Sequence, residues 1–388
     1  MSLLTQANRA SAKPAPAGRA LWRSGHRPFF LLVGLWGALA VPLWVLGLRG
    51  IVPVDAAWHG HEMVFGFATA AVAGFLQAAV PKWTGSAMFS GAPVMALVAL
   101  WCLGRVGAAL APEWPLDLPF LLVLAGLMTR RVVRARNWRN LVVAVVLIAL
   151  AVADVMHHAG YASLALRLGL GLVLTLITLI AGRIVPGFTR NALKRAGLPA
   201  PIVTPVWADR AAVPAVAVAV IVGLLAPATL ATAAVSIAAA AILAIRSARW
   251  GGWQARRWPI VWVLHVAWWF LPLGFVLTAL SALWPTLIAP TAALHAFAAG
   301  TVGGMILAVT SRATLGHAGL PLHAATPMVI AYGALFSAAV LRIGAGIVPS
   351  AAMTLHIAAA SLWCAAWLLF LWVNAPLLLR PRVDGVAG

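Results

Sequence analysis

Long apolar segments recur along the whole chain, and they constrain its fold more than any other feature. An α-helix needs about 20 apolar residues to cross a bilayer core about 30 Å thick. The sequence is 63% hydrophobic and only 9% charged, whereas soluble domains carry about 25% charged residues. We therefore predict an all-α, polytopic membrane bundle of about twelve transmembrane helices. The expected spans are residues 28–48, 60–80, 93–111, 117–134, 140–158, 164–186, 211–226, 228–246, 259–281, 286–310, 326–346 and 351–375.

These spans leave little chain for a separate soluble domain. We expect a cytoplasmic N-terminal tail over residues 1–27, a single transmembrane domain over 28–378 and a cytoplasmic C-terminal tail over 379–388. The first 24 residues are basic and contain no apolar run followed by a cleavage site. This pattern is typical of a tail rather than of a signal peptide.

The basic residues, which give a net charge of +20, are unevenly distributed between the connections. Counted from a cytoplasmic N-terminus, the even-numbered connections and the C-terminal tail contain Lys82, Arg130, Arg131, Arg134, Arg136, Arg139, Arg190, Lys194, Arg195, Arg246, Arg249, Arg256, Arg257, Arg312, Arg380 and Arg382. The odd-numbered connections contain little more than Arg49, Asp55, Glu113 and Asp117. This asymmetry predicts that both termini lie in the cytoplasm, in a bacterial-type inner membrane. The charge then reflects topology and contact with the lipid bilayer, and not a nucleic-acid partner.

Several function classes lack their sequence signatures. The two cysteines, Cys102 and Cys364, lie inside apolar spans, and no C-x-x-C-H motif is present. Covalently attached haem, a disulfide framework and a cysteine-ligated iron–sulfur cluster are therefore excluded. The sequence also has no P-loop, dinucleotide-binding fingerprint, zinc-protease motif or nucleophile elbow.

Two distant segments resemble each other. "TRNALKRAGLP" (189–199) matches "SRATLGHAGLP" (311–321) at an offset of 122 residues, which corresponds to four spans. "PKWTGSAMFSGAP" (81–93) is a looser match four spans earlier. One interpretation is three units of four helices. The other is that helix ends at the cytoplasmic side share Arg, Gly and Pro for capping and charge.

Histidines concentrate toward the predicted outer side of the bundle. This group comprises His59, His61, His157, His158, His295 and His356. A smaller inner group comprises His26, His265, His317 and His323. For isolated histidines such as His26, His157 and His323, interfacial hydrogen bonding is the simpler interpretation.

The stretch "HGHEM" at residues 59–63 is harder to explain without a ligand. His59 and Met63 are four residues apart and share a helix face, whereas His61 is rotated by about 200° from His59. The two histidines are therefore expected to serve different sites. Neutral imidazole suits haem iron and copper, and a thioether suits Cu(I). Glu62 is a candidate for proton delivery or for orienting a histidine.

Five arginines fall within or beside the spans. We expect Arg105, Arg167 and Arg342 to extend toward the interface or to pair with backbone carbonyls. Arg183 and Arg312 are candidates for holding haem propionates, because a guanidinium binds a carboxylate through two hydrogen bonds.

Five stretches together resemble the NnrS family. They are "HGHEMVFGFATAAVAGFLQAAVPKWTG" (59–85), "GRIVPGFTRNALKRAG" (182–197), "VLHVAWWFLPLGF" (263–275), "LHAFAAGTVGGMILAVTSRATLGHAGLPL" (294–322) and "APLLLRPRVDG" (375–385). The resemblance implies a polytopic membrane protein that contains haem and copper and is associated with denitrification and nitric oxide stress. By position it points to His59, His61, Glu62, His265, His295, Arg312 and His317, less securely to His158, and not to His356. The ending "DGVAG" departs from the family pattern, but only in the tail.

A second similarity is architectural. Twelve spans in three four-helix units, with histidines on spans two and ten, are similar to the catalytic subunits of haem-copper oxidases and their nitric oxide reductase relatives. Span six of this chain has no histidine, although that family places a metal ligand there. Any metal site must therefore be built differently, and likeness at the level of fold does not establish chemistry.

These observations lead to one main hypothesis and two alternatives. The main hypothesis is a b-type haem and copper protein that binds nitric oxide, or a related diatomic, or acts on it. If it is a reductase, the electrons come from a quinol or a small carrier. The haem would lie between His61 or His59 and His295, with Glu62 as the candidate catalytic residue. The alternatives are a copper-handling transporter and a haem-based sensor or electron relay. The assigned haem contacts are His61, His295, His265, Arg312 and Arg183. The assigned metal ligands are His59, His61, Met63, His158, His265, His295 and His317.

Overall fold

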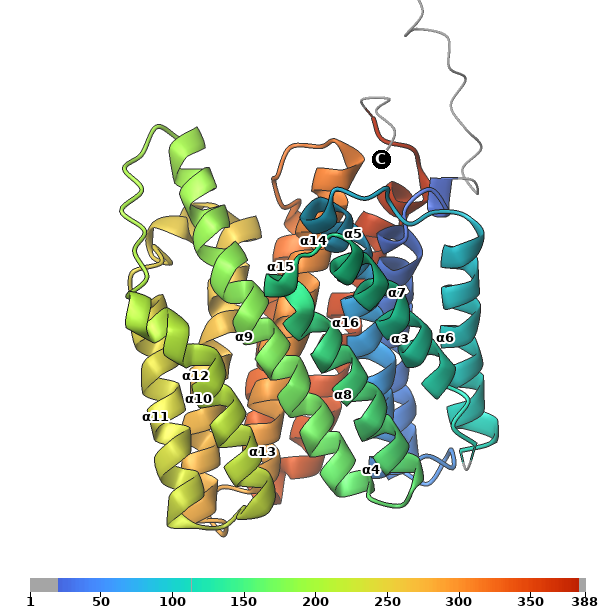
Figure 1. Ribbon diagram of the computed structural model, residues 1–388. Coiled ribbons are helices and arrows are strands. Elements are labelled where there is room, and N and C mark those ends of the chain that lie inside the picture. The colour runs from blue at the N-terminus through green and yellow to red at the C-terminus, as the bar shows by residue number, and fades with distance from the viewer. Residues whose placement is uncertain (1–19, 113, 384–388) are drawn as a thin grey trace, which may run out of the picture.

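The computed structural model describes residues 20–112 and 114–383, and twelve long helices account for most of this part of the chain (Figure 1). They are α3 (His26–Leu48), the continuous unit α4–η1–α5 (Ala56–His61, Glu62–Ala68, Thr69–Thr84), α6 (Ala92–Leu110), α7 (Leu118–Arg134), α8 (Leu141–His158), α9 (Ala162–Arg195), α10 (Val206–Leu225), α11 (Leu230–Ser247), α12 (Pro259–Leu283), the continuous unit α13–η4–α14 (Pro290–His295, Ala296–Gly303, Gly304–Ala318), α15 (Thr326–Gly344) and α16 (Ala352–Leu379). Short 3₁₀ turns precede α8, α12 and α16.

The predicted polytopic helical fold is confirmed. The described residues contain no strand, and eleven of their helices are long and apolar enough to cross a membrane. The remaining long helix, α7, has 17 residues, and its last turn contains Arg131 and Arg134. Residues 1–19 of the predicted N-terminal tail, Glu113 in a predicted outer connection and residues 384–388 of the predicted C-terminal tail lie outside the described residues.

The first and last helices close the bundle. α3 packs along α16, shown as the blue and red ribbons of Figure 1. Near the middle of the contact, Trp363 Nε1 donates a hydrogen bond to the carbonyl oxygen of Gly37 (2.8 Å). Near its end, Arg27 Nη1 donates to the carbonyl oxygen of Leu378 (3.0 Å). The start of α3 and the end of α16 therefore lie at one face of the bundle, which we call the terminal face.

The arginine-rich connections lie at the same terminal face. The long helices alternate in direction, so the connections after α5, α7, α9, α11 and α14 are on the side where α3 begins. These are the connections that carry the clustered cations. The positive-inside rule then predicts that the terminal face is cytoplasmic.

Two units share an unusual internal structure. Ala56–Thr84 and Pro290–Ala318 each contain a π-helical stretch, which begins directly after His61 in the first and after His295 in the second. The two units begin 234 residues apart and end 234 residues apart, and His61 and His295 are separated by the same number. Gly85 and Gly319, both with positive φ, follow them. Shared capping explains the terminal glycines, but it does not explain the matching π-helical stretches. The similarity therefore favours the interpretation that the chain contains an internal repeat.

The helix ends differ from the predicted spans where polar residues continue a helix. α9 extends to Arg195 instead of 186, and α14 extends to Ala318 instead of 310. The tenth span begins at Pro290 instead of 286, so His295 lies closer to its helix end than predicted. Hydropathy marks only the part of a helix that lies in the apolar core of the bilayer. The helix itself is longer, because its backbone hydrogen bonds continue into the interface.

The close packing of α3 on α16 leads to the first prediction. A Cβ added at Gly37 would lie 2.8 Å from Trp367 Cδ2, a buried ring that has little room to move. We expect Gly37→Ala to destabilise the protein by about 1–3 kcal/mol, as overpacking usually does. The measurement is the thermal unfolding midpoint in detergent.

Gly126→Ala in α7 is the matched control, because no atom lies within 4 Å of its added Cβ. An unchanged unfolding midpoint for Gly37→Ala would contradict the close contact between the two helices.

Candidate functional site

His59 and His61 lie on different sides of the α4–η1 unit, as their rotation about the helix predicts. His59 lines a cavity together with Met63 and Val64. His61 is buried among acidic and histidine side chains from α8 and from the segment before α7. The two histidines therefore belong to two separate candidate sites, both near the face opposite the terminal face.

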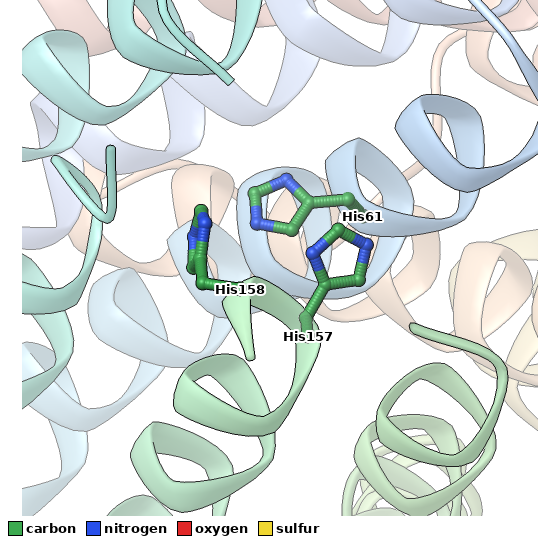
Figure 2. Close-up of side chains that lie close together, drawn as sticks. All are labelled: His61, His157 and His158. Carbon is green, nitrogen blue, oxygen red and sulfur yellow. The ribbon is translucent and has the colours of Figure 1, made fainter. Parts of the chain in front are cut away.

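The first site is a buried group that we call the histidine–carboxylate cluster, consisting of His61, Glu62, Arg105, Asp117, Asp154, His157 and His158. Figure 2 shows the rings of His61, His157 and His158 gathered around one small space, with the last two at the end of α8. The ring centroids of His61 and His157 are 4.6 Å apart.

The nitrogens and carboxylates of this cluster are in direct contact. His61 Nε2 lies 2.8 Å from Asp117 Oδ2 and 3.3 Å from Asp154 Oδ1. His158 Nε2 lies 3.1 Å from Asp117 Oδ1. On the other side of its ring, His61 Nδ1 donates to Glu62 Oε1 at 3.0 Å. The carboxylates of Asp117 and Asp154 thus both lie against the imidazole rings.

Burial makes these contacts energetically important. Glu62 and Asp154 are 0% exposed and Asp117 is 4% exposed. A buried carboxylate is costly unless it is paired. Arg105, itself buried, donates from Nη1 to Glu62 Oε1 (2.7 Å), and its Nη2 lies 3.6 Å from Asp117 Oδ2. Arg105 was expected to extend to the interface or to pair with a backbone carbonyl, but it pairs with carboxylates inside the bundle.

A glycine makes room for this pair. A Cβ added at Gly66 would lie only 2.4 Å from Arg105 Nη1 and 3.1 Å from Glu62 Oε2. Gly66 sits in the π-helical stretch, one turn after Glu62. The glycine of "HEMVFGF" is therefore explained by the close approach of a guanidinium.

The second site is a cavity of about 300 Å³ that we call the histidine cavity. It lies between helices that are far apart in sequence, and its walls are mostly apolar. Its polar and sulfur-containing lining residues are Trp44, His59, Met63, Thr291, His295, Arg342, His356 and Trp363.

Two histidines of this cavity are well arranged for binding a ligand. His295 Nδ1 donates to the carbonyl oxygen of Thr291 (2.8 Å), which leaves Nε2 with its lone pair. This is the usual orientation of a metal-binding imidazole. The ring of His59 stacks on Trp44 with centroids 5.1 Å apart, and its buried Nδ1 has no hydrogen-bond partner among the described residues.

The inner histidines do not form one cluster. His265 Nε2 pairs with Thr189 Oγ1 (2.8 Å) beside an open groove of about 530 Å³. His317 lies instead against His26, with ring centroids 4.2 Å apart. His323 is exposed.

The arginines assigned to haem propionates lie elsewhere. Arg183 Nη1 approaches Asn140 Oδ1 (3.4 Å), and Arg312 stacks over Phe188 with its Cζ 3.9 Å from the ring centroid. Neither is among the described residues that line the histidine cavity, whereas Arg342 is.

Sequence reasoning gave no site role to six charged or histidine residues of these two sites. They are Arg105, Asp117, Asp154 and His157 in the cluster, and Arg342 and His356 in the cavity. The chain has only seven acidic residues, so an aspartate inside a span, such as Asp154, was a usable signal. No comparable signal distinguished Arg342 or His356 from residues at the interface.

The contact at Gly66 gives the second prediction. We expect Gly66→Ala to displace Arg105 from Glu62 and to destabilise the protein by about 1–3 kcal/mol. The thermal unfolding midpoint in detergent measures this, with Gly187→Ala in α9 as a control whose added Cβ meets no atom within 4 Å.

A double-mutant cycle tests the cause of that effect. If Gly66→Ala acts through Arg105, its cost must shrink in an Arg105→Gln background. An equal cost in both backgrounds would show that Gly66 is needed for another reason.

Comparison with known proteins identifies a family. No curated protein matches the chain. The family model described as "NnrS protein" matches residues 20–382, which is nearly the whole sequence and includes both candidate sites. The match agrees with the motifs that carry His59, His61 and His295, and with the multi-pass helical structure. The chain belongs to the NnrS family of membrane proteins.

Proposed function

We propose that this protein is a b-type haem and copper protein that binds nitric oxide in the histidine cavity. The observation that carries the proposal is the placement of His59, Met63, His295 and His356 on one mostly apolar cavity. Family membership supports a role connected with nitric oxide. Neutral imidazoles and a thioether on apolar walls suit haem iron and Cu(I) better than they suit hard cations.

The lining of the cavity offers the contacts that a haem needs. The free Nε2 lone pair of His295 would hold the iron. Val41, Phe67 and Trp363 would supply apolar wall for the macrocycle, and Arg342 would supply a cation for a propionate. The volume of about 300 Å³ lies at the lower end of ligand pockets and is smaller than a haem, so the lining side chains would have to move apart to admit it. When bound, haem supplies an iron centre that takes a diatomic ligand and exchanges electrons.

The same cavity contains a donor set for copper. His59 and Met63 are one helical turn apart and both line the cavity, and His356 lines it from α16. Two imidazoles and a thioether are a soft set that suits Cu(I). In this proposal His295 holds haem iron, and His59, Met63 and His356 hold copper in the same cavity.

A second apolar space beside the cavity supports an uncharged, lipid-soluble ligand. It has a volume of about 80 Å³, lies between α5, α9 and α14, and shares the lining residues Ala68, Val173 and Val302 with the histidine cavity. Its walls are almost entirely apolar, which favours nitric oxide over an ionic substrate. A polar or charged substrate would have to leave water without compensation to enter it.

Turnover is a further part of the proposal. Two nitric oxide molecules, two electrons and two protons give nitrous oxide and water, with electrons from a quinol or a small carrier. Glu62 is not among the described residues that line the cavity. It holds His61 Nδ1 instead, so in this proposal it orients a histidine and does not contact the ligand.

Two substitutions separate haem from copper and form the third prediction. His295→Ala is expected to lower haem content at least tenfold, because it removes the axial ligand. Met63→Leu is expected to keep haem and lose copper, since Leu conserves volume but not the sulfur. The measurements are the reduced-minus-oxidised optical spectrum and metal analysis of detergent-purified protein, with exposed His323→Gln as control.

Nitric oxide added to the reduced wild-type protein should shift the haem bands, because the proposal makes the haem the binding site of the diatomic. Full haem content in His295→Ala would contradict the assignment of the ligand. Absence of haem from the wild type would favour the copper-handling alternative, and haem bands insensitive to nitric oxide would favour an electron relay.

A further inference from the structure

The histidine–carboxylate cluster has the composition of a metal site that is distinct from the histidine cavity. We propose that it binds one divalent metal ion through His61 Nε2, His158 Nε2, one oxygen of Asp117 and one of Asp154. The ligand atoms of these four residues all lie within 4.8 Å of one another. They come from α4, the segment before α7, and α8.

The spacing of the ligand atoms fits a small ion. A tetrahedral zinc ion with bonds of about 2.0–2.1 Å has ligand atoms about 3.3 Å apart. His61 Nε2 lies 2.8 Å from Asp117 Oδ2 and 3.3 Å from Asp154 Oδ1, and His158 Nε2 lies 3.1 Å from Asp117 Oδ1 and 3.9 Å from Asp154 Oδ1. The two imidazoles thus approach different oxygens of Asp117. One atom from each of the four residues lies within 4.8 Å of the others, so an ion would draw the side chains closer together.

Charge gives an independent argument. The cluster contains three buried carboxylates, Glu62, Asp117 and Asp154, and one buried guanidinium, Arg105. With neutral imidazoles the group carries a net charge of −2, and its three carboxylates and its guanidinium are all buried. A buried charge of this size is costly unless it is compensated. One divalent cation between the imidazoles and the aspartates compensates it completely.

The hydrogen bonds of His61 require a positive charge beside the aspartates. With Glu62 ionised, His61 Nδ1 is the donor to it, so a neutral His61 turns the lone pair of Nε2 toward the oxygens of Asp117 and Asp154. A lone pair facing carboxylate oxygens at these distances is repulsive. Either a proton or a metal ion must lie between them. The carboxylate that holds the far nitrogen of the imidazole is the arrangement found behind metal-binding histidines.

Unsatisfied atoms also point into the cluster. Asp154 Oδ2 and both ring nitrogens of His157 are buried and have no hydrogen bond of ordinary geometry among the described residues. His157 packs against His61 at the edge of the same space (Figure 2). His157 groups with His61 and His158 but not with the two aspartates, so it borders the proposed site and is not one of its four ligands.

The donor set selects the class of metal. Imidazole nitrogen with carboxylate oxygen suits zinc or ferrous iron, and the cluster offers no thiolate or thioether for Cu(I). Its protein ligands fill a tetrahedral coordination shell and leave no position for a substrate. The ion would therefore fasten α4 to α8 and to the start of α7, and would not act on nitric oxide. Because His59 and His61 face different sides of one helix, this ion is not part of a centre shared with the cavity.

Cobalt binding tests the proposal and is the fourth prediction. Full-length protein is purified in detergent with any affinity tag removed, stripped with a chelator, and titrated with Co²⁺ as a visible probe for a four-coordinate site. The wild type is expected to take up one equivalent that His158→Gln and Asp154→Asn lose. Glu62→Gln is expected to weaken that binding about 10–100-fold, as loss of a supporting carboxylate usually does.

The matched controls are His323→Gln and Asp55→Asn. His323 is exposed, and Asp55 caps α4 through its side chain, a role that Asn also fills. Both controls should bind cobalt as the wild type does. The thermal unfolding midpoint in detergent, recorded on the same samples, shows whether each variant is folded and depends neither on haem nor on the visible cobalt bands.

Two results would overturn the proposal. One is that the wild-type protein binds no cobalt. Protonated imidazoles would then balance the charge of the carboxylates. The other is equal cobalt binding by wild type, His158→Gln and Asp154→Asn, which would place the ion elsewhere. Loss of haem from His295→Ala is measured separately, so failure of the cavity assignment and failure of this site are distinguishable.

Discussion

The bilayer provides no hydrogen-bond partner for the backbone, and the rest of the structure depends on this constraint. Each apolar segment satisfies its amide and carbonyl groups within a helix, so helices account for most of the described chain. Polar chemistry is then restricted to side chains between helices, where it must be compensated locally. The two candidate sites lie in such places, close to one end of the bundle.

Local departures from regular helix occur where the candidate chemistry lies. A π-helical stretch begins directly after His61 and another directly after His295. Such stretches shift the faces on which later residues lie and are frequent at functional sites. Gly66, inside the first stretch, provides the space that Arg105 occupies beside Glu62. The same segment thus supplies a ligand, its supporting carboxylate and the room for a counter-charge.

One short helix separates two different environments. His59 and Met63 face apolar walls with soft donors and one arginine, which suits haem and copper. His61 and Glu62 face two buried aspartates, which suits a harder divalent ion. The residues around each histidine decide which metal it suits. His59 and His61 are only two residues apart in sequence, but they face these two different environments because they lie on different sides of the helix.

The sequence by itself determined the polytopic helical class, because the length of an apolar segment is a local property and it decides whether the segment can span a bilayer. It also separated His59 from His61, since helical rotation is fixed by the backbone. The helix ends were less predictable, because α9 and α14 continue through polar residues. Only the tertiary structure decided which side chains meet. Asp117 and Asp154 reach His61, and Arg105 reaches Glu62, from three other segments. His356 and Arg342 join His59 and His295 in the cavity. Packing between distant helices is not encoded in any one span.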